Sequence, residues 1–212
     1  MSLLLLSACG LGTISSTTAS DPLETAFYLT VDHPDTPSML LALSNSYIGS
    51  CKAPALTADD EEALLEFYMA ASREGSQVAL LELRRYGVST WEGVYPVADR
   101  DFQPNDLSGQ RPFIAQGAYL HVREAELDDE EGLERSYRVT DAVWAPEVAA
   151  PGQVSISSWE PDGVLVGQLA FESLDVSARF RAAPCDVSYE DSIFPYTDQL
   201  ALLFEEQDPQ EN

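Results

Sequence analysis

Apolar and polar residues alternate most regularly in the last third of the chain, between Gly152 and Cys185. In its final segment the alternation is strict: Val176, Ala178, Phe180 and Ala182 against Ser177, Arg179 and Arg181. A period of two predicts a strand with one buried face. Two further strands are expected over 154–159 and 164–171, joined by a turn with Pro-Asp-Gly chemistry. Gly167 is expected to mark a bulge or a close approach of another strand.

Six earlier segments also have the β-branched, aromatic and aliphatic character of strands. They cover residues 26–33, 38–51, 77–88, 90–97, 118–127 and 136–145. The fifth alternates with a period of two, with Tyr119, His121 and Arg123 on one face and Leu120, Val122 and Ala125 largely on the other. Eight or nine short strands with one helix favour a mainly β fold, as an antiparallel β-sandwich or a partly closed barrel.

The one predicted helix covers about residues 58–74. Its apolar residues recur at helical spacing: Leu64, Leu65, Phe67, Tyr68 and Ala71. Thr57 can cap the N-terminus with Asp60 as the capping-box partner, and Gly75 is a suitable C-terminal stop. We expect the apolar face of this helix to be part of the core.

Charge is strongly unbalanced, with 11 Lys and Arg against 36 Asp and Glu and a formal net charge of -25. Nucleic acid is therefore not expected as a partner, because binding to a phosphate backbone requires clustered basic residues. Acidity of this extent indicates solubility and self-repulsion rather than a particular ligand site.

The N-terminal stretch Leu6–Cys9 (LSAC) follows a short run of leucines and resembles the lipobox of bacterial lipoproteins. The resemblance implies that Cys9 carries a lipid, such as palmitate, and becomes the first residue of the mature protein. A signal peptide has a basic start and a longer apolar stretch, so residues 1–9 look like a truncated one. The alternative is a chance cysteine in an unstructured N-terminus. Residues 10–24 are rich in Gly, Ser and Thr and are expected to form a flexible tether.

Two cysteines, Cys51 and Cys185, are left once Cys9 is assigned to the lipid. An even number is what one disulfide in an oxidising compartment requires, and each lies beside a proline-containing turn. Two unrelated buried thiols are the alternative. The chain has no CxxC motif and no neighbouring pair of histidines, so a zinc site is not expected.

Two stretches together resemble a recurring, functionally uncharacterised group of Gram-negative lipoproteins. The early stretch is LSNSYIGSC, and the late one is GQVSISSW…DGVLVGQLAF…ARFRAAPC. The resemblance implies an outer-membrane location, facing the periplasm or the cell surface, and a two-cysteine β domain over residues 25–190. It implies no catalytic residues. Residues 191–212 would form a C-terminal extension that ends in an acidic tail.

Candidate chemistry is sparse along the chain. Only His33 and His121 could serve a Ser-His-Asp triad, and His121 is expected on a half-exposed sheet face. The sequence contains no GxSxG, HExxH, P-loop or GxGxxG motif. A weak calcium site is conceivable in one loop with four oxygen-bearing side chains: Asp99, Asp101, Asn105 and Asp106.

These observations favour a lipid-anchored envelope protein that binds an unidentified protein or other envelope partner, or has a structural role, without catalysis or a cofactor. The membrane itself is expected as a partner through the lipid. The alternative is an extracellular hydrolase that cleaves polymers with a pair of carboxylates, which abundant Asp and Glu would allow.

Overall fold

The strands account for most of the chain that the computed structural model describes, which is residues 11–17, 19–31, 37–47, 51, 71–98, 112–128, 136–145, 151–189, 192 and 194. The strands are β1 (Gly12–Ser15), β2 (Ser20–Pro22), β3 (Thr25–Val31), β4 (Ser38–Ser44), β5 (Gln77–Arg85), β6 (Gly93–Pro96), β7 (Phe113–Asp128), β8 (Ser136–Ala145), β9 (Gly152–Ser158), β10 (Leu165–Phe171) and β11 (Val176–Pro184). A short 3-10 helix, η2 (Glu172–Leu174), connects the last two strands.

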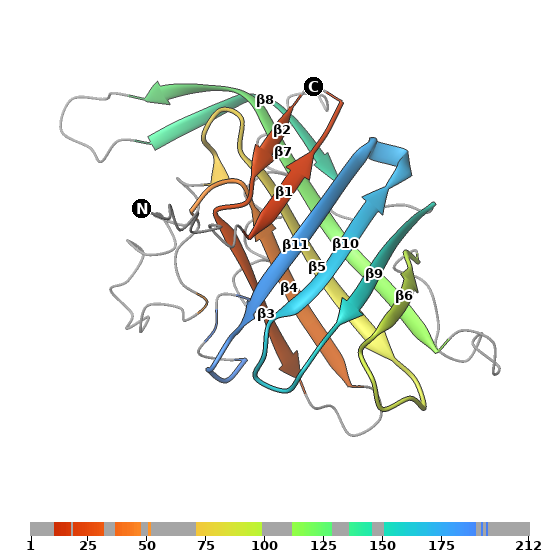
Figure 1. The fold of residues 1–212 in the computed structure, drawn as a ribbon. Coiled ribbons are helices and arrows are strands. Elements are labelled where there is room, and N and C mark those ends of the chain that lie inside the picture. Colours follow the sequence, from red (N-terminus) through yellow and green to blue (C-terminus); the bar gives the residue numbers. More distant parts are fainter. Residues whose placement is uncertain are drawn as a thin grey trace, which may run out of the picture.

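All eleven strands belong to one sheet in the order β6-β9-β10-β11-β3-β4-β5-β7-β8, with β1 pairing to β11 and β2 to β1. The sheet curves so that β6, β9, β10 and β11 form a front layer and β3, β4, β5, β7 and β8 a back layer (Figure 1). Near β6, a single bridge between Val97 and Ala115 joins the two layers. The fold is therefore the predicted mainly β type, an open barrel or sandwich.

Strands β3 to β11 correspond to the segments that the hydrophobic pattern predicts. All pairs between named strands are antiparallel except one, in which Ala183 and Pro184 of β11 pair in parallel with Phe27 and Tyr28 of β3. Gly167 lies at the irregularity between β9 and β10, as predicted. The Pro-Asp-Gly turn is also confirmed, since the Gly163 N–H donates to the carbonyl of Glu160 at 2.9 Å.

The expectation of a flexible tether over residues 10–24 is wrong for most of this segment. Residues 12–15 and 20–22 are strands, and the side chain of Ile14 is fully buried in the core. The pairing of β11 with β3 is confined to Ala183 and Pro184, so β11 keeps a free edge along residues 177–180, and β1 pairs there. An available strand edge thus orders a segment whose composition alone favours disorder.

The main core fills the space between the two layers. Alternate residues of the front strands contribute Val154, Ile156, Leu165, Leu169, Phe171, Val176, Ala178, Phe180 and Ala182. The back layer contributes Tyr28, Met39, Leu41, Leu43, Leu81, Leu83 and Tyr119, among others. The inward set of β11 is the one that the sequence alternation predicts.

The back layer is also apolar on its other face. Phe27, Leu29, Val78, Leu120 and Val122 form a second cluster there. This explains why β3, β4 and β5 read as nearly continuous apolar runs, which is typical of strands buried on both faces.

Two predictions concern segments beside this second cluster. The helix predicted over 58–74 lies outside the described residues except for its last turn, in which Ala71 is helical and buried in the second cluster. Gly75, the predicted stop, has a φ of 81°, a left-handed conformation that favours glycine. Of the C-terminal extension, Phe194 packs edge-to-face on Phe27, with ring centroids 5.9 Å apart.

No helix in the described part of the chain is long and apolar enough to cross a membrane.

Candidate functional site

Several residues that the sequence marks as candidates lie outside the described residues. These are Cys9, His33 and the four members of the weak calcium loop, Asp99, Asp101, Asn105 and Asp106. Within the described residues, no group of three or more His, Cys, Asp or Glu side chains is arranged to hold a metal ion.

The predicted disulfide between Cys51 and Cys185 is present. The two Cα atoms are 5.8 Å apart, within the usual range for a disulfide, and the bridge spans 134 residues of sequence. Both cysteines pack against the second cluster, and the Cys185 N–H donates to the carbonyl of Tyr28 at 2.7 Å. The bridge therefore links the segment after β4 to the end of β11.

The side of the front layer that faces away from the core carries a group of polar side chains, which we call the polar face. Strands β1, β9, β10 and β11 contribute Thr13, Ser15, Gln153, Ser155, Gln168, Ser177, Arg179 and Arg181. Strand register sets their order, because Thr13, Arg179, Gln168 and Ser155 are successive neighbours across four strands. At a strand spacing of about 4.8 Å, this row is about 14 Å wide.

A depression of about 430 Å³ lies in the polar face and is lined by seven of these side chains, Arg181 being the exception, with Leu169, Ala170 and Ala178. Hydroxyl and amide groups can both donate and accept hydrogen bonds, whereas the guanidinium of Arg179 only donates and is always charged. The depression can therefore bind a polar ligand that carries an anionic group.

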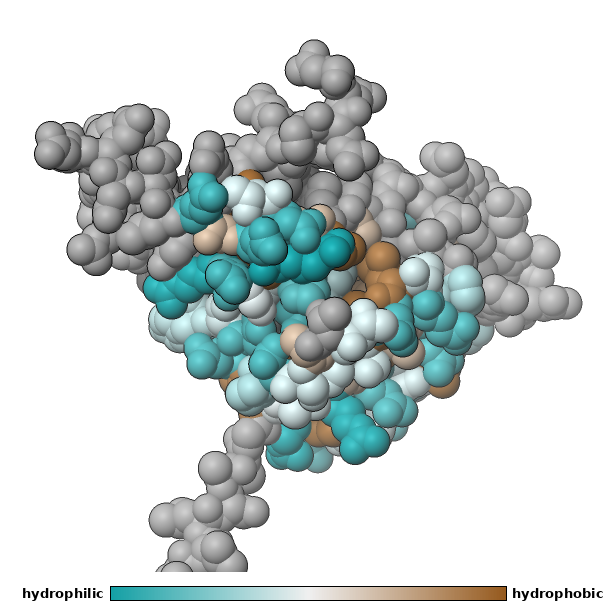
Figure 2. Space-filling model, turned by 90° about the horizontal axis from the view of Figure 1, so that it is seen from above, coloured by the Kyte–Doolittle hydropathy of each residue, from teal (hydrophilic) through white to brown (hydrophobic). Residues whose placement is uncertain are grey.

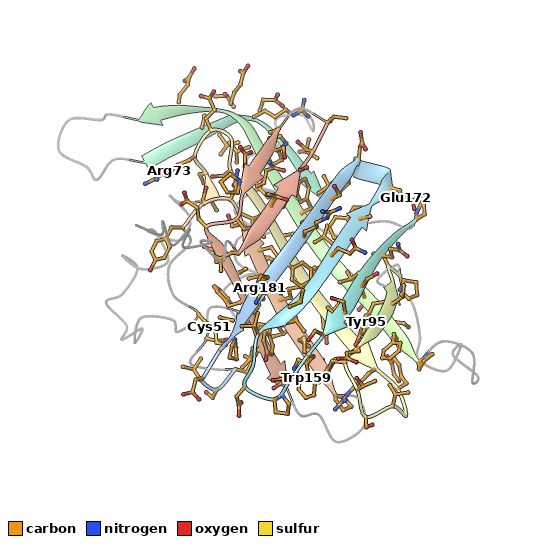
Figure 3. The ribbon with its side chains drawn as sticks, in the orientation of Figure 1. Cys51, Arg73, Tyr95, Trp159, Glu172 and Arg181 are labelled. Atoms are coloured by element: carbon orange, nitrogen blue, oxygen red, sulfur yellow. A yellow bond between two sulfur atoms is a disulfide. The ribbon has the colours of Figure 1, made fainter. Side chains whose placement is uncertain are left out.

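The charge of the polar face is opposite to that of the chain. No outward position in the described strands β1, β9, β10 and β11 is Asp or Glu, although the chain has 36 of them. Arg179 and Arg181 are exposed, and neither is in an ion pair with a described carboxylate. Figure 3 shows Arg181 in the C-terminal half of β11, whereas Glu172 follows the end of β10 at the opposite end of the layer.

Two other described arginines, Arg84 and Arg123, are already paired with carboxylates. Arg84 is 2.7 Å from the carboxylate of Glu82, and this hydrogen bond raises the pKa of the guanidinium. Arg123 lies 3.6 Å from a carboxylate oxygen of Asp141. Arg179 and Arg181 can therefore pair with a ligand, whereas the guanidinium groups of Arg84 and Arg123 already pair with carboxylates.

The exposed hydrophobic side chains do not form a continuous surface to which a partner could bind. Large exposed hydrophobic side chains in the described residues are scattered: Tyr47, Val94, Val164 and Tyr189. Seen from above, the described surface is mostly hydrophilic, with only small hydrophobic areas (Figure 2). Scattered apolar residues of this kind need no functional explanation.

A second group of polar side chains, the interior polar cluster, lies where the β1–β2 hairpin contacts the back layer. It consists of Asp21, Asn45, Gln77 and Tyr119. A carboxylate oxygen of Asp21 accepts from Gln77 Nε2 at 3.1 Å and from Asn45 Nδ2 at 3.3 Å. The Tyr119 hydroxyl donates to Gln77 Oε1 at 2.8 Å, and Gln77 is fully buried. Burial raises the pKa of Tyr119, so its hydroxyl stays protonated.

His121 is next to this cluster, because it is the register partner of Gln77. The expectation of a half-exposed face is wrong, since only 6% of His121 is exposed. Burial and the positive charge of Arg123 lower the pKa of its imidazole, while Asp21 and Asp141 oppose the shift.

Sequence reasoning places Arg179 and Arg181 correctly on the outward side of their strand but misses the polar face as a unit. Its members come from 13–15, 153–155, 168 and 177–181, which only the strand register brings together. One signal was present in the sequence, since these segments contain no acidic residue in an otherwise acidic chain.

Comparisons with known proteins add no further identification. No family model, curated protein or solved structure matches this chain.

Proposed function

We propose that this chain is a lipid-anchored protein of the bacterial cell envelope that acts by binding and not by catalysis. Cys9, at the end of the stretch Leu6–Cys9, would carry the lipid. The β domain would present the polar face to its partner in an oxidising compartment.

The observation that carries this proposal is the Cys51–Cys185 disulfide. Disulfides persist in secreted and periplasmic proteins and are rare in the reducing cytosol. Two of the three cysteines are thus used in the bridge, and the remaining one, Cys9, ends a lipobox-like stretch. The cysteine usage and the N-terminal pattern both support export followed by acylation.

The distribution of carboxylates supports binding over hydrolysis. Hydrolysis of a polymer by two carboxylates requires a pair facing each other across the scissile bond. The interior polar cluster contains one carboxylate, Asp21, which already accepts two hydrogen bonds. The polar face has hydrogen-bonding groups and two free arginines but no carboxylate among its residues.

Acylation can be tested by expressing the gene with its native upstream region in bacteria fed an alkynyl fatty acid. We expect the wild-type protein to be labelled and Cys9→Ser to be unlabelled, with mass spectrometry placing the lipid on the peptide that begins at Cys9. The double variant Cys51→Ala/Cys185→Ala keeps Cys9 and is the matched control, because it should still be labelled. Equal labelling of wild type and Cys9→Ser would reject the anchor.

Catalysis can be tested separately on the purified domain with broad hydrolase substrates. We expect no turnover. A turnover signal that disappears when a single Asp or Glu is replaced in the folded protein would replace the binding proposal by the hydrolase alternative.

A further inference from the structure

We infer that the polar face lies against the membrane, where Arg179 and Arg181 bind the phosphate groups of lipid headgroups. The inference rests on the proposed acylation of Cys9 and goes beyond it, because an anchor alone does not determine which side of the domain faces the lipid.

The chain enters the sheet beside the arginines of β11. The carbonyl of Leu11 accepts a hydrogen bond from the Arg181 N–H at 2.7 Å, and Gly12 is the register partner of Phe180. Cys9 precedes Gly12 by three residues, which can span at most about 11 Å. A lipid on Cys9 would therefore hold the middle of β11 close to the membrane surface.

Because β1 is an ordered strand, the domain cannot move far from a lipid on Cys9. Ile14 is fully buried, and β1 is hydrogen-bonded to both β11 and β2. A flexible segment of 10–24 would allow the domain to tumble far from the membrane, whereas a paired strand that begins at Gly12 does not. The absence of a tether in this region is thus the structural basis of the orientation.

The charge of the polar face is complementary to that of an anionic membrane. A formal net charge of -25 repels the domain from an anionic membrane. The polar face is the exception, since the described outward positions of its four strands have two arginines and no carboxylate. Screening limits charge effects to about 8 Å at physiological salt, so the local charge of the nearest face decides the orientation.

The chemistry of the polar face fits a phosphate headgroup. Guanidinium groups match phosphate with paired hydrogen bonds and are weakly hydrated. The hydroxyl and amide groups around the depression, such as Ser177 and Gln168, can bond the remaining ester and amine groups of a headgroup. The carboxylates of the adjoining turns, Glu172 and Asp162, lie beyond the strand ends.

Arginine footprinting tests the orientation directly. The full-length acylated protein would be inserted into vesicles of phosphatidylethanolamine with a minor amount of phosphatidylglycerol and treated with phenylglyoxal. Modification of each arginine would be measured by mass spectrometry. The reference is Cys9→Ser mixed with the same vesicles, and the internal control is Arg123, which is half exposed on the other layer.

We expect anchoring to slow the modification of Arg179 and of Arg181 about fivefold each, because the attraction of one basic residue to an anionic membrane surface corresponds to about a fivefold change. The modification rate of Arg123 should not change. If Arg179 and Arg181 react as fast in the anchored protein as in Cys9→Ser, the inference is wrong. Protection of Arg179 and Arg181 in Cys9→Ser as well would also overturn it, because the face would then be covered by a second copy or another partner. Lipid found on the Cys9 peptide distinguishes these outcomes from failure of the anchor itself.

A second experiment tests whether the two charges matter. A fluorescent donor at Ser157→Cys, an exposed position of β9 beside the polar face, and an acceptor on lipid headgroups would report the distance of this face from the membrane, with Arg123→Cys as the matched control position. Energy transfer should be greater from position 157, and Arg179→Gln/Arg181→Gln should remove most of the difference. An unchanged difference would show that these arginines do not bind phosphate.

Discussion

At the scale of single residues, Gly167 of β10 allows its neighbours in the front layer to approach closely. A Cβ on this residue would lie 2.6 Å from the ring of Phe180 and 2.6 Å from the carbonyl oxygen of Ser155. We predict that Gly167→Ala lowers the free energy of unfolding by about 1–3 kcal/mol, because the added methyl group forces the packed ring and the backbone to move. Denaturant unfolding followed by fluorescence measures this loss.

The matched control is Gly152→Ala in the neighbouring strand β9. There the added Cβ would meet its nearest atoms at 3.1 Å, which requires a much smaller adjustment. A loss for Gly152→Ala as large as that for Gly167→Ala would contradict the packing argument.

His121 makes the stability of the protein depend on pH. Burial lowers the pKa of its imidazole below the ordinary value of 6.5, so between the two pKa values the unfolded chain binds more protons than the folded one. Stability then falls as the pH drops below about 6.5. We predict that His121→Gln reduces the loss of unfolding free energy between about pH 7 and about pH 5.

The carboxylates contribute to the same loss in every variant, so the comparison uses the difference between variants. The explanation is wrong if the free energy of unfolding of His121→Gln falls with pH as steeply as that of the wild type.

At the scale of elements, the β1–β2 hairpin depends on contacts with distant segments. β1 pairs with β11, and Asp21 of β2 accepts hydrogen bonds from Asn45 and Gln77. We predict that Asp21→Ala lowers the free energy of unfolding by about 1–3 kcal/mol, because it leaves the buried amide of Gln77 without its acceptor. Hydrogen exchange at the Leu23 N–H, which donates to the Gly12 carbonyl, should become faster as the hairpin opens.

Ser20→Ala is the control in the same strand. Its hydroxyl is exposed and bonds only to that of Ser15 among the described residues, so removal should change stability by less than about 0.5 kcal/mol. If Asp21→Ala and Ser20→Ala have the same free energy of unfolding, the interior polar cluster does not stabilise the β1–β2 hairpin.

The elements differ in how far the sequence predicts them. Strands β9, β10 and β11 are recognised because alternation and the Pro-Asp-Gly turn are local signals. Strand β1 is missed because its order comes from the free edge of β11, more than 160 positions away in the sequence, and its composition favours disorder. Propensity is a weak guide wherever a distant strand edge decides the structure.

At the scale of the whole molecule, the sequence predicts the type of fold, the disulfide and the outward direction of Arg179. It does not predict the polar face, since Thr13 and Ser155 become neighbours of Arg179 and Gln168 only through the register of four strands. The parallel pairing of β11 with β3 likewise has no local sequence signal. What the sequence misses here arises from contacts between segments far apart in the chain.

The Cys51–Cys185 disulfide closes a loop of 134 residues, which in the chain-entropy model stabilises the fold by about 5 kcal/mol. We predict that Cys51→Ala/Cys185→Ala folds with the same strands, because the Cys185 N–H still donates to Tyr28, but loses about 2–5 kcal/mol of unfolding free energy. Urea unfolding with and without a reductant measures this. The reductant should shift the wild-type midpoint toward that of the double variant and leave the double variant unchanged. A wild-type midpoint that does not respond to complete reduction would mean that the bridge contributes little, and that the two layers and the second cluster hold the ends of the loop together by packing alone.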